Sequence, residues 1–236
     1  MSPREPVDGG PAAATEPPVR RRFRIRFRKE GLLRFIGHND LLRAWDRALR
    51  RTGLPLKRTE GFHAKTKLSS PTALALGVAG LEEVLDVELT EDVPAQEVLA
   101  RLRRELPEEL RAESAAPLPA RGASSTVEAF EYVCRIEGGC AESEVRARRD
   151  ELLSSPSWIV ERRAPGKPAR SIDVRSKLES LTVDGDGVRF RVRVDGGSTA
   201  RPEEVLGILG LGDAWRDGRV LVVRTRVELA DDRAAP

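Results

Sequence analysis

The stretch RRFRIRFRKEGLLRFIGHNDLLRAWDRALRRTG, residues 21–53, contains the two patterns that decide the fold. Its beginning alternates apolar and basic side chains, and this period of two predicts a half-buried β-strand. Its later part places apolar residues at i, i+1, i+4, i+7 and i+8, which predicts an amphipathic helix from about residue 40 to 51. Gly53 and Pro55 are typical of a helix end. The chain therefore begins as a strand followed by a helix that packs on it.

Outward from this stretch, the same kinds of pattern continue and then repeat. Residues 65–76 and 82–90 favour strands, Pro94 favours the start of a second helix, and a weaker strand is expected around residues 110–117. After the small-residue stretch PLPARGASS, the order strand, helix, strand, strand, helix, strand occurs again. Two βαββαβ units are typical of ferredoxin-like sandwiches. We therefore predict an α+β protein built from tandem ferredoxin-like sandwiches.

This pattern predicts where the domains begin and end. Residues 1–19 are rich in Pro, Ala and Gly and lack an apolar run, so we expect a disordered tail. The first ferredoxin-like domain then covers residues 20–119 and is basic, and the second covers residues 120–236.

Composition excludes several classes of protein. No stretch approaches the roughly 18 consecutive apolar residues of a membrane span, and the tail resembles no secretory or transit signal, so we expect a cytoplasmic protein. Cys134 and Cys140 are the only cysteines, and with two histidines they cannot supply four ligands at zinc or iron–sulfur spacing. Walker, dinucleotide-binding, zinc-protease and nucleophile-elbow motifs are missing from the sequence. We expect no metal, no cofactor and no catalytic residue.

Charge is distributed unevenly along the chain. Residues 20–67 contain sixteen Lys or Arg against four acidic residues, although the whole chain has a net charge of only +3. Such a local excess is typical of a surface that meets phosphate. The remainder of the chain is accordingly acidic, and this asymmetry favours an anionic partner for the N-terminal half.

Arginines recur on one side of several predicted elements. On the helix they occur at i, i+4, i+7 and i+8, as Arg43, Arg47, Arg50 and Arg51, and on strands they alternate as Arg22, Arg24, Arg26, then Arg189, Arg191, Arg193, then Arg224, Arg226. We interpret them as one continuous positive tract for a phosphate backbone, because guanidinium pairs bidentately with phosphate. The alternative is an ordinary solvated surface. Only 4% of residues are aromatic, which argues against base stacking on the sheet.

Two further features stand beside the arginine-bearing helix. His38 precedes it, next to two residues that could cap its backbone amides, and it could contact a substrate, hold a loop or act as a general base on a ribose hydroxyl. The stretch KRTEGFHAKTK, residues 57–67, could close over a phosphate or base, with Phe62 stacking and the cations neutralising charge. The alternative for this stretch is a β-hairpin arm that is merely basic.

The sequence resembles a radical-SAM-associated family of unknown function, domain of unknown function 2344. The resemblance rests on LRFIGHNDLLRAWDRALRRTGLPL, EGFHAKTKLS, SIDVRSKLESL, GSTARPEEVLGILGL and VVRTRVEL. It covers roughly residues 20–230 and carries over the positions His38, Asp40, Arg47, Arg50, Gly61, Phe62, Arg201, Pro202 and Arg224. Gly37 replaces the usual serine, and His63-Ala64-Lys65 replaces an asparagine–proline-like loop. The resemblance implies an accessory role beside a separately encoded radical SAM protein, because the three-cysteine cluster motif is missing.

Taken together, these patterns predict a non-catalytic accessory protein that binds RNA, such as transfer or ribosomal RNA, and works with a radical SAM enzyme. A metal-independent RNA-processing nuclease and a protein-interaction module without nucleic acid are the alternatives. The residues expected at the nucleic-acid interface are Arg24, Arg26, His38, Arg43, Arg47, Arg50, Arg51, Lys57, Arg58, Phe62, His63, Lys65 and Lys67.

Overall fold

The computed structural model describes residues 21–62, 64–119, 126–163, 166, 168–185 and 187–234. The tail predicted for residues 1–19 lies outside the described residues, and so does His63.

The first half of the chain follows the predicted order, with one correction. Its elements are β1 (Arg21–Lys29), η1 (Gly31–Phe35), α1 (His38–Arg51), β2 (Leu68–Ser69), β3 (Ala79–Leu89), α2 (Ala95–Glu105) and β4 (Ala112–Leu118). The strand expected over residues 65–76 is reduced to the two residues of β2. Pro71 cannot donate a ladder hydrogen bond, and the backbone beyond it leaves the sheet as a loop.

The second half contains the predicted elements together with an additional hairpin. Its elements are β5 (Val127–Ile136), α3 (Glu142–Ser154), β6 (Ile159–Arg162), β7 (Arg170–Asp173), α4 (Val174–Lys177), β8 (Leu178–Asp184), β9 (Gly187–Arg193), α5 (Pro202–Ile208), α6 (Gly212–Arg216), β10 (Val220–Leu229) and η2 (Ala230–Ala234). β6 and β7 form a separate two-stranded sheet.

In the part of the chain that the structure describes, eight strands form one mixed sheet that runs through both halves. Their order is β4-β1-β3-β10-β5-β9-β8, with β2 also paired to β3. The α+β class is confirmed, but a single sheet replaces the two separate sheets that we expected. The reason is the shortness of β2, which leaves much of one edge of β3 unpaired. β10 pairs with that edge in parallel at Ala79 and Gly80, whereas the other neighbouring strands are antiparallel.

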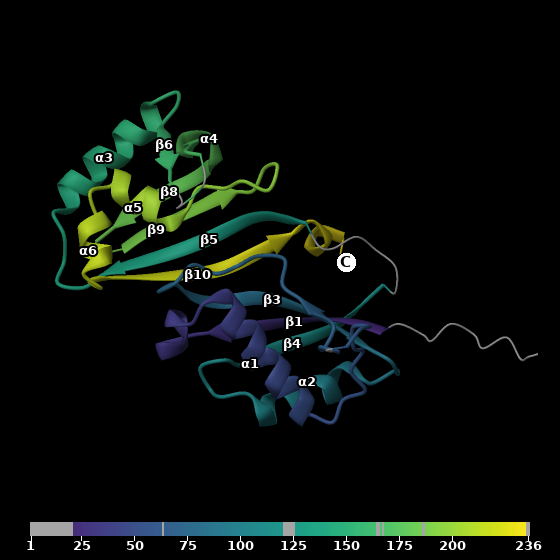
Figure 1. The fold of residues 1–236 in the computed structure, drawn as a ribbon. Coiled ribbons are helices and arrows are strands. Elements are labelled where there is room, and N and C mark those ends of the chain that lie inside the picture. Colours follow the sequence, from purple (N-terminus) through teal and green to yellow (C-terminus); the bar gives the residue numbers. More distant parts are fainter. Residues whose placement is uncertain are drawn as a thin grey trace, which may run out of the picture.

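The helices pack on the apolar side of this sheet. Figure 1 shows α1 and α2 beside the β1–β4 end and α3, α5 and α6 beside the β5–β8 end. In the first half, Phe23, Ile25 and Phe27 of β1 pack against Leu41 and Trp45 of α1 in one buried cluster. A second cluster fills the other half and includes Val78 and Val84 of the first half. The alternate residues of β1, β5 and β9 point to the opposite side, which we call the helix-free face.

Candidate nucleic-acid interface

The arginine-bearing helix α1 forms because its two sides differ in polarity. Leu41, Trp45, Ala48 and Leu49 are buried, and the ring of Trp45 meets Phe27 edge-on at a centroid distance of 5.0 Å. The arginines follow the opposite side, where Arg43, Arg47, Arg50 and Arg51 are exposed. The helix starts at His38 after Gly37, and no side chain caps it, so the expected cap by a neighbouring side chain is wrong. Burial of the apolar side therefore directs the guanidinium groups outward.

The stretch 57–67 folds back on itself as a hairpin, which we call the basic arm. The amide of Lys67 donates to the carbonyl of Lys57 at 2.8 Å, and the amide of Thr59 donates to that of Lys65 at 2.8 Å. The base of the arm is joined to the sheet through the amide of Lys57, which donates to the carbonyl of Glu88. On its other side the amide of Thr66 donates to Asp46 Oδ1 of α1 at 3.3 Å. The arm is thus fixed beside α1.

A groove of about 530 Å³ lies between α1 and the basic arm. We call it the α1–arm groove, and its lining residues are Asn39, Leu42, Arg43, Asp46, Arg50, Thr59, Lys65, Thr66 and Leu68. α1 and the arm together carry eight Lys or Arg against three acidic residues. The groove is therefore a concave surface with a positive border and an apolar floor that Leu42 and Leu68 supply.

The cations around the α1–arm groove are weakly neutralised. Arg43 pairs with Asp40 at 3.0 Å and Arg50 pairs with Asp46 at 2.8 Å, both on the exposed surface. Exposed pairs of this kind contribute at most about 1 kcal/mol, so a phosphate can replace them at little cost. Among the described residues, no carboxylate lies within ion-pair distance of Arg47, Arg58 or Lys65.

Four other predicted residues lie nearby but make different contacts. Arg51 points across to α2 and pairs with Glu105 at 2.9 Å. Lys67 pairs with Glu88 of β3 at 2.9 Å. Phe62 lies at the turn of the basic arm with its ring fully exposed. His38 is half-buried at the first turn of α1 and does not line the groove.

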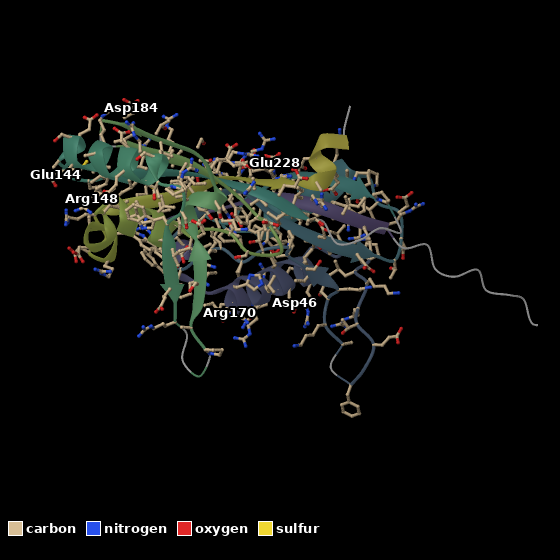
Figure 2. All side chains as sticks on the ribbon, turned by 90° about the horizontal axis from the view of Figure 1, so that it is seen from above. Asp46, Glu144, Arg148, Arg170, Asp184 and Glu228 are labelled. Atoms are coloured by element: carbon tan, nitrogen blue, oxygen red, sulfur yellow. The ribbon has the colours of Figure 1, made fainter. Side chains whose placement is uncertain are left out.

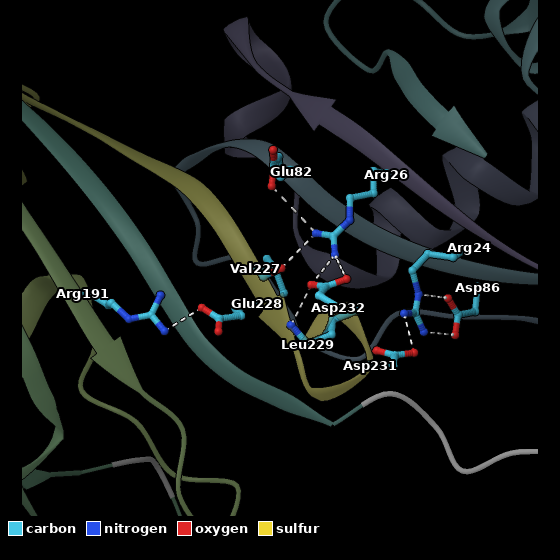
Figure 3. A network of polar contacts seen from close by, with 10 residues as sticks. All are labelled: Arg24, Arg26, Glu82, Asp86, Arg191, Val227, Glu228, Leu229, Asp231 and Asp232. Atoms are coloured by element: carbon cyan, nitrogen blue, oxygen red, sulfur yellow. Dashed lines mark hydrogen bonds and ion pairs between the residues drawn. The ribbon is translucent and has the colours of Figure 1, made fainter. Parts of the chain in front are cut away.

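Arg24 and Arg26 are separated from the α1–arm groove by the sheet. They point to the helix-free face, where carboxylates from distant parts of the chain hold them (Figure 3). Arg24 is buried between Asp86, at 3.1 Å, and Asp231, at 2.7 Å. Arg26 donates to Asp232 at 2.7 Å and to the carbonyl of Val227 at 2.9 Å. These contacts correct the expectation of one continuous basic tract.

The pKa of Arg24 reflects this environment. Burial opposes the charged form, but the hydrogen bond to Asp231 and the nearby charge of Asp86 outweigh it and raise the pKa of the guanidinium. Arg24 is therefore a permanent cation that already has its anionic partners. It has no free edge to offer a phosphate, and the same carboxylates would repel one.

The other strand arginines are held in similar ways. Arg191 lies among Glu131, Glu179 and Glu228, at 3.0, 2.6 and 2.6 Å. Arg224 is buried on the helix side where the two halves meet, and it pairs with Glu83 through contacts of 2.8 and 2.5 Å. Alternation correctly predicted the side of the strand for Arg191 but not for Arg224, where the register of β10 shifts before Arg226, and it predicted the carboxylate partners of neither residue.

Neither a metal site nor a membrane-spanning helix occurs among the described residues. No group of three or more His, Cys, Asp or Glu side chains in this part of the chain could hold a metal ion. No helix here has the length and apolarity needed to cross a membrane. Cys134 is buried, and burial raises the pKa of its thiol to about 12, which makes it a poor nucleophile.

Comparison with known proteins identifies one family and several weak structural likenesses. Residues 22–202 match the family described as uncharacterized protein conserved in bacteria (DUF2344). No curated protein matches the chain. One chain of a Cbf5–Nop10–Gar1 complex is 15% identical, with a TM-score of 0.42, over 87% of this chain and 48% of that one. One chain of an H/ACA RNP bound to a substrate RNA containing 2′-deoxyuridine is 15% identical, with a TM-score of 0.39, over 87% and 47%.

The third likeness is an unknown protein from Galdieria sulphuraria, 14% identical, with a TM-score of 0.25 over 89% of this chain and 99% of that one. The present chain spans about half the length of the first two. TM-scores below 0.5 do not establish a shared fold.

Proposed function

We propose that this chain, which belongs to the DUF2344 family of uncharacterized proteins conserved in bacteria, binds single-stranded RNA along the α1–arm groove. The observation that carries the proposal is a groove of about 530 Å³ whose lining includes three cations, Arg43, Arg50 and Lys65, against one acidic residue, Asp46. Of the cations on α1 and the basic arm, Arg47, Arg58 and Lys65 have no carboxylate within ion-pair distance among the described residues. The protein acts without catalysis of its own.

A single strand suits this groove better than a duplex does. The basic arm and α1 approach each other closely enough for a hydrogen bond between Thr66 and Asp46, so the space between them is narrow. A flexible strand can follow a narrow curved surface with its phosphates on the cations and its bases on apolar or aromatic side chains. The exposed ring of Phe62 at the turn of the arm supplies such a side chain.

Salt-dependent binding tests this proposal. Fluorescence anisotropy of a labelled single-stranded RNA is measured while salt is raised from about 50 to 200 mM. We expect log affinity to fall linearly with log salt by about 0.7 per phosphate contact. The variant Arg43→Ala/Arg50→Ala/Lys65→Ala should bind more weakly and lower that slope by about 2, because it removes three contacts.

A matched control removes three cations elsewhere. Arg104, Arg135 and Arg148 are exposed, lie outside the groove and have no ion-pair partner among the described residues. Their replacement by Ala lowers the net charge equally but should leave most of the affinity. A flat salt response, or an equal loss in the groove variant and the control, contradicts binding in the groove.

The proposal extends to the architecture of the two halves. We interpret each half as a ferredoxin-like sandwich, with domains at residues 20–119 and 120–236. The strand orders β4-β1-β3-β2 and β10-β5-β9-β8 support this interpretation, since both follow the order 4-1-3-2 of their own strands. Separate expression of the two segments tests it: two cooperative unfolding transitions support two domains, and failure of both segments to fold contradicts them.

The partner in this proposal is a separately encoded radical SAM protein, and it rests on the resemblance seen in the sequence. Co-purification of the two proteins, with and without ribonuclease treatment, tests this part. Retention after treatment supports direct contact, and loss indicates a bridge of RNA. If the two proteins do not associate under either condition, the partnership is contradicted. The proposal that RNA binds in the groove is not affected by that result.

A further inference from the structure

A second groove, of about 330 Å³, lies where the first and second halves of the chain meet. Its first-half side includes Arg34, Phe35 and Leu76, and its second-half side includes Glu137, Trp215 and Leu221. We call it the η1–α6 groove, and it shares no lining residue with the α1–arm groove. Figure 2 shows Asp46 of the α1–arm groove well apart from Arg148, which lies beside the turn between α5 and α6. The two grooves are therefore separate surfaces.

The first-half side of this groove consists of apolar residues that the fold leaves exposed. η1 has the sequence GLLRF, yet none of its residues is buried. Leu32 and Phe35 share one side of it, because a 3₁₀-helix has about three residues per turn. They are 82% and 53% exposed, and Leu76 is 61% exposed. The amide of Gly77 donates to the carbonyl of Arg34 at 2.9 Å and holds Leu76 beside η1. Three of the five exposed large apolar residues in the described part of the chain therefore lie here.

The second-half side continues this apolar surface. Trp215 is half-buried against the core of the second half, and Leu221 of β10 is also half-buried. Exposed apolar side chains that gather at one place mark interaction sites in soluble proteins, and aromatic residues are enriched in protein interfaces. RNA suits this surface less well, because aliphatic residues such as Leu32 and Leu76 neither stack flat on a base nor contact a phosphate. The groove therefore fits a protein partner.

Two opposite charges flank the apolar surface, one on each side of the groove. Within the described residues Arg34 has no carboxylate at ion-pair distance, and its guanidinium lies over the ring of Phe35 at 4.7 Å. Glu137 is exposed and has no cation at ion-pair distance in the same part of the chain. The cations of α6 and of the turn after it pair with their own neighbours instead. A partner segment of one charge sign would attract one of these two residues and repel the other.

A second copy of this chain satisfies both charges at once. The interface of a two-fold dimer is self-complementary, so each contact between two different residues occurs twice. Arg34 and Glu137 come from opposite sides of the groove, and a two-fold axis between them brings each beside the other residue of the second copy. Phe35 and Leu76 of the two copies then cover one another near that axis.

We propose that the η1–α6 groove is the interface of a two-fold dimer of this chain. Arg34 of each copy pairs with Glu137 of the other, and the exposed apolar residues of η1 and the following loop pack together. This inference does not depend on RNA binding in the α1–arm groove.

Reversal of the two charges tests this interface. Sedimentation velocity of the full chain, treated with ribonuclease so that RNA cannot bridge two copies, is measured from about 1 to about 500 μM. We expect a dimer whose fraction rises with concentration. Arg34→Glu and Glu137→Arg each place like charges opposite one another twice, so each should raise the dissociation constant at least about tenfold. Arg34→Glu/Glu137→Arg restores opposite signs and should restore the dimer.

Controls separate this interface from other surfaces. Phe35→Ser/Leu76→Ser should abolish the dimer, whereas Ile159→Ser, at an exposed apolar residue outside the groove, should leave it unchanged. Arg104→Glu, which reverses an exposed charge on α2, should also have no effect. Circular dichroism and thermal melting confirm that each variant is folded.

Three outcomes contradict the proposal. The first is a chain that stays monomeric at every concentration, or that associates only before ribonuclease treatment. The second is a dimer that survives both single charge reversals and Phe35→Ser/Leu76→Ser. The third is a double variant Arg34→Glu/Glu137→Arg that stays as dissociated as the single variants, since the two residues would then not be paired.

Discussion

The helix-free face and the α1–arm groove use the same residue type in opposite ways. On the helix-free face, Arg24, Arg26 and Arg191 each contact two or more acceptors, and these come from strands or turns distant in sequence. In the groove, Arg43 and Arg50 pair only with acids one helical turn away and remain exposed. A count of arginines therefore says little about binding. The carboxylates within reach decide which arginines hold the fold together and which are available to a ligand.

The largest effect is expected from the buried pair of Arg224 and Glu83, whose side chains are 2% and 3% exposed. Replacing Arg224 by Met leaves the charge of Glu83 buried, so it should lower the free energy of unfolding by about 3–5 kcal/mol. Urea denaturation measures this loss. The double variant Arg224→Met/Glu83→Leu removes both charges and should lose much less. Equal losses in the two variants would contradict the description of Arg224 as a structural cation.

The next largest effect concerns the groove and leaves stability unchanged. Phe62 is fully exposed, so Phe62→Ala should change the melting temperature little. If a base stacks on its ring, affinity for single-stranded RNA should fall by about 1–3 kcal/mol. Anisotropy titration gives the affinity, and Leu32→Ala, at another exposed apolar residue, is the control. If Phe62→Ala binds single-stranded RNA with unchanged affinity, the turn of the basic arm is not part of the interface.

A smaller effect is expected from the acids that hold Arg24 and Arg26. Asp231→Asn/Asp232→Asn removes two partly exposed carboxylates, and we expect a loss of about 1 kcal/mol in the free energy of unfolding. The variant also frees positive charge on the helix-free face. RNA affinity should nevertheless stay the same, because Asp86 still neutralises Arg24. A clear gain in affinity would instead indicate that the helix-free face can bind RNA once its acids are removed.

The smallest effect is expected at the exposed arginines of β9. Arg189 and Arg193 point to the helix-free face and are exposed. Replacing both by Gln should change RNA affinity by less than about 0.5 kcal/mol, the usual limit for surface positions outside a site. If RNA affinity fell as much as in the Arg43→Ala/Arg50→Ala/Lys65→Ala variant, the helix-free face would bind RNA as well as the α1–arm groove does, contrary to our prediction.

Sequence patterns predicted local structure well and long-range pairing poorly. Alternation in residues 21–29 predicted that Phe23, Ile25 and Phe27 are buried, although Arg24 and Lys29 are buried as well, and the helical stripe predicted α1 to within two residues at its start. The partners of Arg24 and Arg26 could not be predicted, because Asp231 and Asp232 lie more than two hundred residues away along the chain. The single sheet was missed for a related reason: it depends on β10 filling the edge that the short β2 leaves open.

For the candidate site, too, the sequence predicted features that are close together along the chain and missed those that long-range contacts create. The cations of α1 and the basic arm were visible in the sequence because they are neighbours along it. The cavity of about 350 Å³ beside Arg224 was missed, although three of its lining residues, Arg201, Pro202 and Arg224, belong to motifs of the family resemblance. Phe130 and Tyr132 gave no signal, since a buried aromatic pair is ordinary in a strand. Only the fold brings them to one cavity.

The pairing of β10 with β3 also affects how the protein is made. β10 follows β3 by more than a hundred residues, so a nascent chain leaves the ribosome with the strand edge at Ala79 and Gly80 still unpaired. During that interval Arg24, Arg26 and Glu83 lack the partners that β10 and η2 later bring. Synthesis of the C-terminal strand is thus the step that closes the sheet and completes the buried charge pairs of the N-terminal half.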